Sequence, residues 1–260
     1  MGWMTSSGVS MHYEVSGRGQ RSLILVHELG GTLDSWDAVL PLLEPEFRIL
    51  RFDQRGSGLS EKVRKPFTID DHVQDLQNIL EVVELPPPYY LAGMAAGAAV
   101  VLGFVHRRGA EAAAVVLCAA ATDVGPDRRQ FLLDRADLAC REGMRAVADM
   151  TLERSFPQAV RHDPAVFEDY RGRLLANDPV CYAAANRALL DAHLDEAIAG
   201  LGCRCLVLAG AHDGLRPPED VAALARRLPG AEFAVLDTAH VMPVQAPELF
   251  AEHLLEFFLR

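Results

Sequence analysis

The sequence predicts an α/β protein in which a mostly parallel sheet carries helices on both faces. From residue 9 to residue 121, short β-type runs alternate with longer helical patterns, which is typical of βαβ units. Several of these runs are apolar throughout, as expected for strands covered by helices on both faces. The 260 residues, half of them hydrophobic, are enough for one large core.

The predicted elements follow in chain order. Strands are expected at residues 9–15, 22–27, 47–52, 89–92 and 113–118. A helix is expected to begin after Thr68, because Asp71 stands three residues later and apolar side chains then recur at helical spacing. This helix should end near Leu85, before three consecutive prolines.

The strand pattern disappears between residues 122 and 200, where the sequence indicates several amphipathic helices. This segment contains ten arginines, no lysine and fourteen acidic residues. Alternation resumes with expected strands at 203–208 and 233–236 and helices at 218–228 and 243–259. We therefore expect a sheet core made of residues 1–121 and 201–260, with 122–200 inserted as a helical cap.

Composition excludes several classes of partner. Lysine and arginine number 25 against 36 acidic residues, a net charge of −11, so nucleic acid is not an expected partner. Five cysteines without C-x-x-C spacing favour a reduced, cytoplasmic protein. The longest uncharged apolar run, 91–105, is shorter than the roughly 20 residues of a membrane span. We expect no membrane association, metal or cofactor.

The segment 91–97 follows an expected strand and precedes an alanine-rich helix, which is the setting of a G-x-S-x-G nucleophile elbow. Ala95 stands at its centre, between Gly93 and Gly97. Glycines suit a sharp strand-to-helix turn that leaves no room for side chains beside it. The alternative is an ordinary strand-to-helix turn with small residues for packing.

Other segments that could complete a catalytic site occur in a characteristic order along the chain. His27 to Gly31 follows the strand at 22–26, in a turn of the type that supplies an oxyanion-hole amide. Late in the chain, Asp213 comes just past one strand and His240 just past the last. Nucleophile, acid and histidine in this order are typical of α/β-hydrolases.

Over essentially its whole length the sequence therefore resembles the α/β-hydrolase superfamily, and it is most similar to the 3-oxoadipate enol-lactonase branch. The segments MTLERSF at 150–156 and NDPVCYAAA at 177–185 resemble cap segments of that branch. The sequence departs from it at Ala95, where the family has serine, and at Glu28, where many members have glycine. The resemblance implies acyl transfer of the Ser-His-Asp type in aromatic catabolism.

In this interpretation His240 is the general base and Asp213 holds its imidazole, with Asp123 as the alternative acid. The backbone amides of Leu29 and Ala96 are expected to form the oxyanion hole, and replacement of the nucleophile by alanine leaves both donors in place.

Glu28 has two interpretations. A carboxylate beside an oxyanion hole opposes the developing negative charge unless it is protonated, turned away or paired. It is therefore either a loop residue that points to the surface or a contact to substrate. A carboxylated substrate would bind one or two cap arginines, but the sequence does not choose among the ten.

We expect a hydrolase of a small, carboxylated ester or enol-lactone, in which Ala95 replaces the nucleophile, so that this chain binds ligand without turnover. Carbon-carbon or amide hydrolysis on the same scaffold is an alternative. A natural non-catalytic homologue that binds a small molecule is another. The sequence leaves the oligomeric state open.

Overall fold

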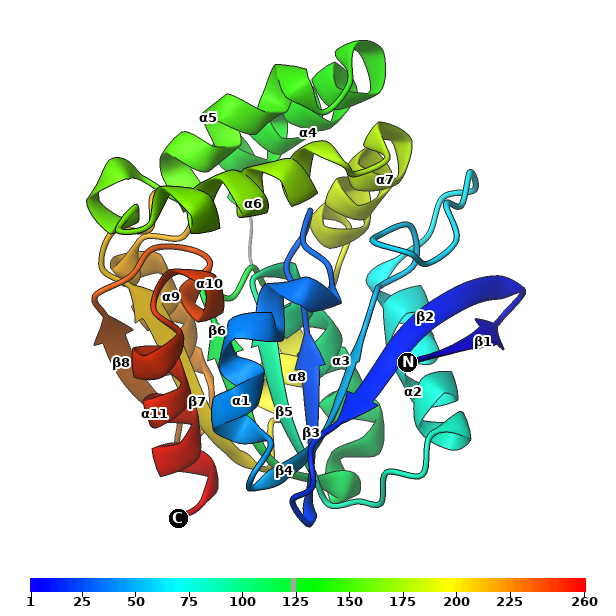
Figure 1. Ribbon diagram of the computed structural model, residues 1–260, viewed down its shortest axis with the longest axis vertical. Helices are drawn as coiled ribbons and strands as arrows, with labels where there is room; N and C mark the ends of the chain where they lie inside the picture. The colour runs from blue at the N-terminus through cyan, green and yellow to red at the C-terminus, as the bar shows by residue number, and fades with distance from the viewer. Residues whose placement is uncertain (123–124) are drawn as a thin grey trace.

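The computed structural model describes residues 1–122 and 125–260, and in these residues eight strands form one sheet (Figure 1). The strand order is β1-β2-β4-β3-β5-β6-β7-β8. Strand β2 pairs antiparallel with β1 and β4, whereas the pairs from β4 to β8 are parallel. The predicted mostly parallel sheet is confirmed. The strands are β1 (Gly2–Ser6), β2 (Val9–Ser16), β3 (Arg21–Val26), β4 (Phe47–Phe52), β5 (Tyr89–Met94), β6 (Ala112–Cys118), β7 (Arg204–Gly210) and β8 (Glu232–Leu236).

Strand β1 was not predicted from the sequence. It forms a hairpin with β2 through Ser7 and Gly8, whose φ angles are 47° and 82°. Positive φ at both central residues is the geometry of a tight hairpin turn that matches the twist of the strands. Only alternate side chains of this edge strand face the protein, so its apolar pattern is weak in the sequence.

Helices cover both faces of the sheet and enclose two apolar cores. One face carries α2 (Ile69–Val82), α3 (Ala96–Arg108), α8 (Asp195–Ala199) and α9 (Pro218–Arg227). The opposite face carries the 3-10 helix η1 (Leu33–Val39), α1 (Leu40–Leu43), α10 (Met242–Gln245) and α11 (Pro247–Phe258). Fully buried rings from Trp36, Phe47 and Phe250 fill the second core.

Helix α2 begins as the sequence predicts. The Thr68 hydroxyl accepts from the Asp71 amide and the Asp71 carboxylate accepts from the Thr68 amide, which together make a capping box. The helix ends at Val82, earlier than the predicted Leu85, because Val83 is already extended, with φ −86° and ψ 136°. Leu85, directly before Pro86, is also disfavoured in the helical conformation.

Four helices lie above the carboxyl ends of the strands (Figure 1). They are α4 (Pro126–Glu142), α5 (Arg145–Ser155), α6 (Pro164–Leu175) and α7 (Pro179–Leu190), and we call them the cap. Helix α8, which the sequence assigned to the same insertion, instead packs beside α3 in the first core. We therefore propose that the insertion at 122–200 consists of this roof and a short return helix.

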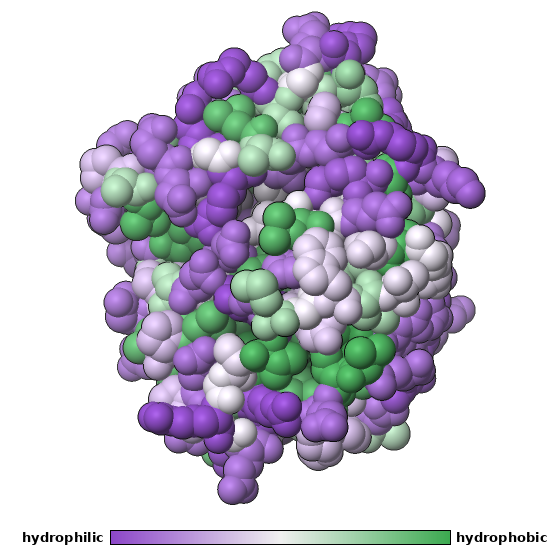
Figure 2. Space-filling view, turned by 45° about the vertical axis from the view of Figure 1, so that its right-hand side comes forward, coloured by the Kyte–Doolittle hydropathy of each residue, from purple (hydrophilic) through white to green (hydrophobic). Residues whose placement is uncertain are grey.

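The cap presents a mostly hydrophilic surface in the view of Figure 2, where the upper part of the molecule is dominated by polar and charged residues. A broad apolar surface there would favour a lipid-facing lid. Within residues 1–122 and 125–260, no helix combines the length and the apolar character needed to cross a bilayer.

The buried His72 should make stability depend on pH. Its ring packs edge-on against Phe67 at 5.1 Å, and burial, aided by the positive charge of Arg55, lowers the pKa of His72 from 6.5 to about 3. The unfolded chain therefore binds a proton that the native state excludes, so stability present above pH 6.5 is lost as the pH falls. We expect the unfolding free energy to drop by about 2 kcal/mol between pH 7.5 and 5 from this group alone.

Urea unfolding at the two pH values should show this drop in the parent and lose it in His72→Phe. His106→Gln, at an exposed position of α3, is the matched control and should keep the slope of the parent. Equal slopes in the parent and His72→Phe would show that other groups carry the dependence.

Candidate active site

Strand β5 turns into α3 at Ala95, whose backbone has φ 49° and ψ −108°. This left-handed geometry costs a non-glycine residue on the order of 1–3 kcal/mol. Three backbone hydrogen bonds hold it: the Ala95 amide donates to Cys118 O at 2.8 Å, and Ala95 O accepts from Ala98 N at 3.2 Å and Ala121 N at 3.1 Å. The turn is therefore a constrained elbow, as the sequence predicted, and not a relaxed strand-to-helix connection.

Glycine is required at positions 93 and 97, on the two sides of Ala95, because a side chain at either position would clash with the backbone. A Cβ on Gly93 would lie 2.7 Å from Ala98 Cα, and a Cβ on Gly97 would lie 2.3 Å from Val26 O. Both obstacles are backbone atoms, which cannot move without shifting β3 or α3. The missing side chains let the first turn of α3 approach the end of β3.

Replacement of Gly97 by alanine should destabilise the protein by about 2–3 kcal/mol, since overpacking against a backbone cannot be relieved by a side-chain rotation. Gly172→Ala is the matched control, because Gly172 lies in α6 with nothing within 4 Å of an added Cβ. That substitution should stabilise by about 0.5–1 kcal/mol. Chemical unfolding of both variants measures the difference, and equal effects would contradict the packing argument.

His240 and Asp213 come together although 27 positions separate them in the chain. His240 Nδ1 lies 2.7 Å from Asp213 Oδ2, and the Asp213 side chain is fully buried. The second oxygen, Oδ1, accepts from the amides of Leu215 at 2.8 Å and Arg216 at 2.9 Å. A carboxylate only accepts, so in the neutral form of the imidazole Nδ1 carries the proton and Nε2 carries a lone pair.

The carboxyl end of α5 holds the loops of both residues. Ser155 O accepts from the His240 amide at 3.2 Å and from the Gln245 side chain at 2.9 Å. Arg154 O accepts from the Gly214 amide at 3.0 Å, and the Arg154 guanidinium donates back to Gly214 O. The cap therefore fixes the position of the histidine and of its carboxylate.

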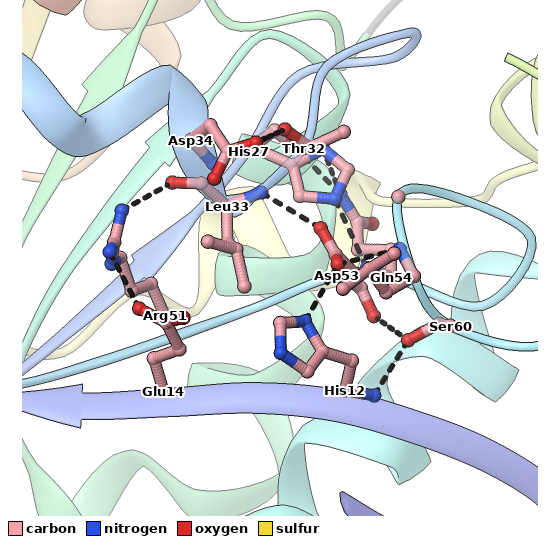
Figure 3. Close-up of polar contacts among 12 residues, drawn as sticks. His12, Glu14, His27, Thr32, Leu33, Asp34, Arg51, Asp53, Gln54 and Ser60 are labelled. Atoms are coloured by element: carbon pink, nitrogen blue, oxygen red, sulfur yellow. Dashed lines mark hydrogen bonds and ion pairs between the residues drawn. The ribbon is translucent and has the colours of Figure 1, made fainter. Parts of the chain in front are cut away.

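The loop after β3 is clamped from below by the loop after β4 (Figure 3). Asp53 Oδ1 accepts from the Leu33 amide at 3.0 Å, and Asp53 Oδ2 lies 2.9 Å from His12 Nδ1. His27 Nε2 accepts from the Gln54 amide at 3.0 Å, so its Nδ1 donates to Glu28 O at 2.7 Å. Both nitrogens of His27 are thus engaged in holding the loop.

The backbone amides of Leu29 and Ala96 make no hydrogen bond to the described parts of the protein. Neither donates to an acceptor among the described residues, and both residues line the cavity that Ala95 and His240 also line. Unpaired amides that converge on a cavity suit an incoming anion or carbonyl oxygen.

Glu28 does not point to the surface, so that interpretation is wrong. The residue is 1% exposed and lines the cavity. Its Oε1 accepts from Ser35 Oγ at 2.9 Å and Tyr170 Oη at 3.1 Å, whereas its Oε2 has no partner. A Cβ on Gly31 would lie 2.3 Å from Oε1, so this glycine makes room for the carboxylate. Burial and the adjacent Glu28 raise the pKa of Tyr170 well above 10.0.

The cavity lies between the strand ends and the cap, and its volume is about 80 Å³. Its floor is formed by Ala95, Ala96, Leu29 and His240. Its roof contains aromatic rings, and four arginines line its walls: Arg128, Arg135, Arg154 and Arg216. Glu28 is the only acid among the described lining residues.

The structure thus brings together five of the predicted positions, namely Ala95, Ala96, Leu29, His240 and Glu28, at one cavity, with Asp213 behind His240. The alternative acid, Asp123, lies outside the described residues. Sequence reasoning did not find Tyr170, whose hydroxyl binds Glu28 from α6. No local signal marks a tyrosine as the partner of an acid 142 positions away.

A strained elbow beneath a helical roof, with an Asp-His pair at the ends of the last two parallel strands, is the architecture of an α/β-hydrolase. The family model described as serine aminopeptidase, S33, matches residues 19–240, and the chain belongs to this family. It is 24% identical over 262 residues to 3-oxoadipate enol-lactonase 2 of Acinetobacter baylyi. The aligned region covers 99% of this chain and 96% of the relative.

Two further relatives differ in the bond that their names indicate. The enol-lactonase from Burkholderia xenovorans LB400 has a crystal structure that matches with a TM-score of 0.93 and 26% identity, over 100% of both chains. Pyrrolizixenacetamide deacetylase of Xenorhabdus hominickii is 23% identical over 251 residues, 95% of this chain and 94% of the relative.

Proposed function

We propose that this site is built for acyl transfer from a small, carboxylated ester or enol-lactone, and that Ala95 occupies the position of the nucleophile. The observation that carries the proposal is the convergence of the Asp213-supported His240, the strained Ala95 and the two unpaired amides on one cavity. The similarity to enol-lactonases over nearly the whole chain supports the choice of bond.

Each part has a defined task when a serine stands at position 95. The hydroxyl attacks the carbonyl carbon while His240 Nε2 accepts its proton, and Asp213 stabilises the imidazolium. The amides of Leu29 and Ala96 receive the oxygen anion. His240 then gives the proton to the leaving oxygen as its bond to the carbonyl carbon breaks. A water molecule next loses a proton to His240 and attacks the acyl carbon, and the serine oxygen takes that proton back as the acid is released.

Alanine at position 95 has no hydroxyl, so this chain forms no acyl intermediate. Loss of the serine in such triads lowers the rate on the order of a million-fold, whereas the binding groups around the cavity remain. We therefore propose that the chain binds substrate without measurable turnover.

Restoration of the hydroxyl tests the proposal. Ala95→Ser should hydrolyse small esters and lactones and should be labelled by a serine-directed phosphonate, because the general base and both amides are in place. Mass spectrometry detects the label, and the release of acid gives the rate.

His240→Ala in the Ala95→Ser background should abolish labelling, whereas His253→Ala, a partly buried position of α11 remote from the cavity lining, should keep it. If Ala95→Ser binds a ligand but hydrolyses no ester, lactone or amide, the non-catalytic interpretation replaces this proposal.

Amide hydrolysis is the second candidate, and Glu28 is the observation that favours it. Glu28 lines the cavity together with Leu29, and its buried Oε2 has no partner, whereas an amide carries an N–H that an ester lacks. The relationship to a deacetylase of an acetamide supports the same class.

Glu28→Gln in the Ala95→Ser background distinguishes the two bonds. If Glu28 accepts from an amide N–H, kcat/KM for a small acetamide should fall by about tenfold or more, while the matched acetate ester changes little. An equal fall for both would assign Glu28 to the support of the loop and of Tyr170 instead.

A further inference from the structure

The four arginines that line the cavity are not equivalent. Arg128 pairs with Asp220 at 2.8 Å, and Arg154 donates twice to Gly214 O. Arg216 is likewise already engaged. Arg128 and Arg154 thus hold the cap and its loops, and Arg216 has an interaction of its own, so we consider Arg135.

Arg135 projects from α4 and is 6% exposed. Its Nη2 donates to Asn186 Oδ1 at 2.9 Å, and its buried Nε has no acceptor. The amide of Asn186 is oriented by its own bond to Tyr182 O at 2.8 Å, so a neutral oxygen is turned toward the cation. Among the residues that the structure describes, no carboxylate lies within 4.0 Å of this guanidinium.

The surroundings of Arg135 are otherwise aromatic. Its guanidinium carbon lies 6.0 Å from the Phe131 ring centroid and 5.7 Å from that of Tyr182. Ring faces attract a cation but do not satisfy its N–H groups. An arginine does not lose its proton inside a protein, so Arg135 keeps a positive charge that no described side chain neutralises.

The acid that shares the cavity does not serve as the counter-ion. Glu28 is bound by the hydroxyls of Ser35 and Tyr170, and it makes no ion pair with a described residue. A buried charge without a partner is unfavourable, and the charge of Arg135 lies at the wall of the cavity. The missing partner must therefore come from the ligand.

We infer that Arg135 is the binding group for the carboxylate of the substrate, with its free N–H groups directed to the carboxylate oxygens. Planar guanidinium and carboxylate groups match in pairs of parallel hydrogen bonds. This inference rests on the proposed function, since it takes the cavity to be the substrate site. It makes Arg135 the residue that selects acids over neutral esters.

Binding to the chain with Ala95 tests the inference without any turnover. Calorimetric titration with monomethyl glutarate and with dimethyl glutarate compares an anion with its neutral analogue of the same length. We expect the parent to bind the monoester about 10- to 100-fold more tightly, and Arg135→Gln to lose that preference while it still binds the diester as before.

Two further variants separate recognition from packing. Arg135→Lys keeps the charge but loses the planar fork, so it should restore only part of the preference. Arg141→Gln removes an exposed charge from the same helix and should keep the full preference. Thermal melting checks that each variant is folded, and addition of the monoester should raise the melting temperature of the parent more than that of Arg135→Gln.

Equal affinity of the parent for the two esters, or the same loss of both in Arg135→Gln, would overturn the inference. The proposed function fails separately, through the absence of hydrolysis by Ala95→Ser. If Ala95→Ser does hydrolyse, Arg135→Gln in that background should lower kcat/KM for the monoester by the same 10- to 100-fold and leave the diester within about twofold.

Discussion

The close approach of α3 to β3 is the constraint on which the rest of the site depends. It is possible only because Gly97 has no side chain where its Cβ would meet Val26 O at 2.3 Å. Ala95, two residues before Gly97, has φ 49°, and Leu29 stands three residues beyond Val26. Ala95, Ala96 and Leu29 all line one cavity beside this contact.

The cap does more than cover this cavity. It binds the Asp213 loop through Arg154 and the His240 loop through Ser155, and Asn177 donates to Gly30 O at 2.8 Å in the loop that carries Leu29. Every segment proposed to take part in the chemistry except the elbow therefore has a hydrogen bond to a cap helix or its end. Such bonds couple the position of the roof to the geometry of the loops that carry His240, Asp213 and Leu29.

Two side chains in the cavity, Glu28 and Arg135, are buried with unused hydrogen-bonding capacity. The fold could have satisfied each with a neighbour, as it satisfies Arg55 with Asp75 at 2.6 Å. Groups left in this state weaken the folded protein and gain a partner only when ligand enters. Their opposite characters, an acid in the loop after β3 and a cation on α4, are the basis of our inference that the ligand has two different polar ends.

Much of this protein was determined by the sequence alone. Alternating apolar runs predicted the sheet, the Thr68 and Asp71 pair predicted the start of α2, and chain order brought out Ala95, Asp213 and His240, because these signals are local or follow the order of strands. The edge strand β1 was not predicted, because alternate side chains along it face solvent and its apolar pattern is weak.

Only the tertiary structure decided where Glu28 and Arg135 lie and what they contact. Ten arginines stand in the inserted segment, and nothing in their local sequence distinguishes Arg135, which is buried at the cavity and donates only to the neutral Asn186. Glu28 looks like any loop acid until Tyr170, 142 positions away, is seen to bind it. Burial and charge pairing are sums over contacts between distant segments, so they exist only when the chain has folded.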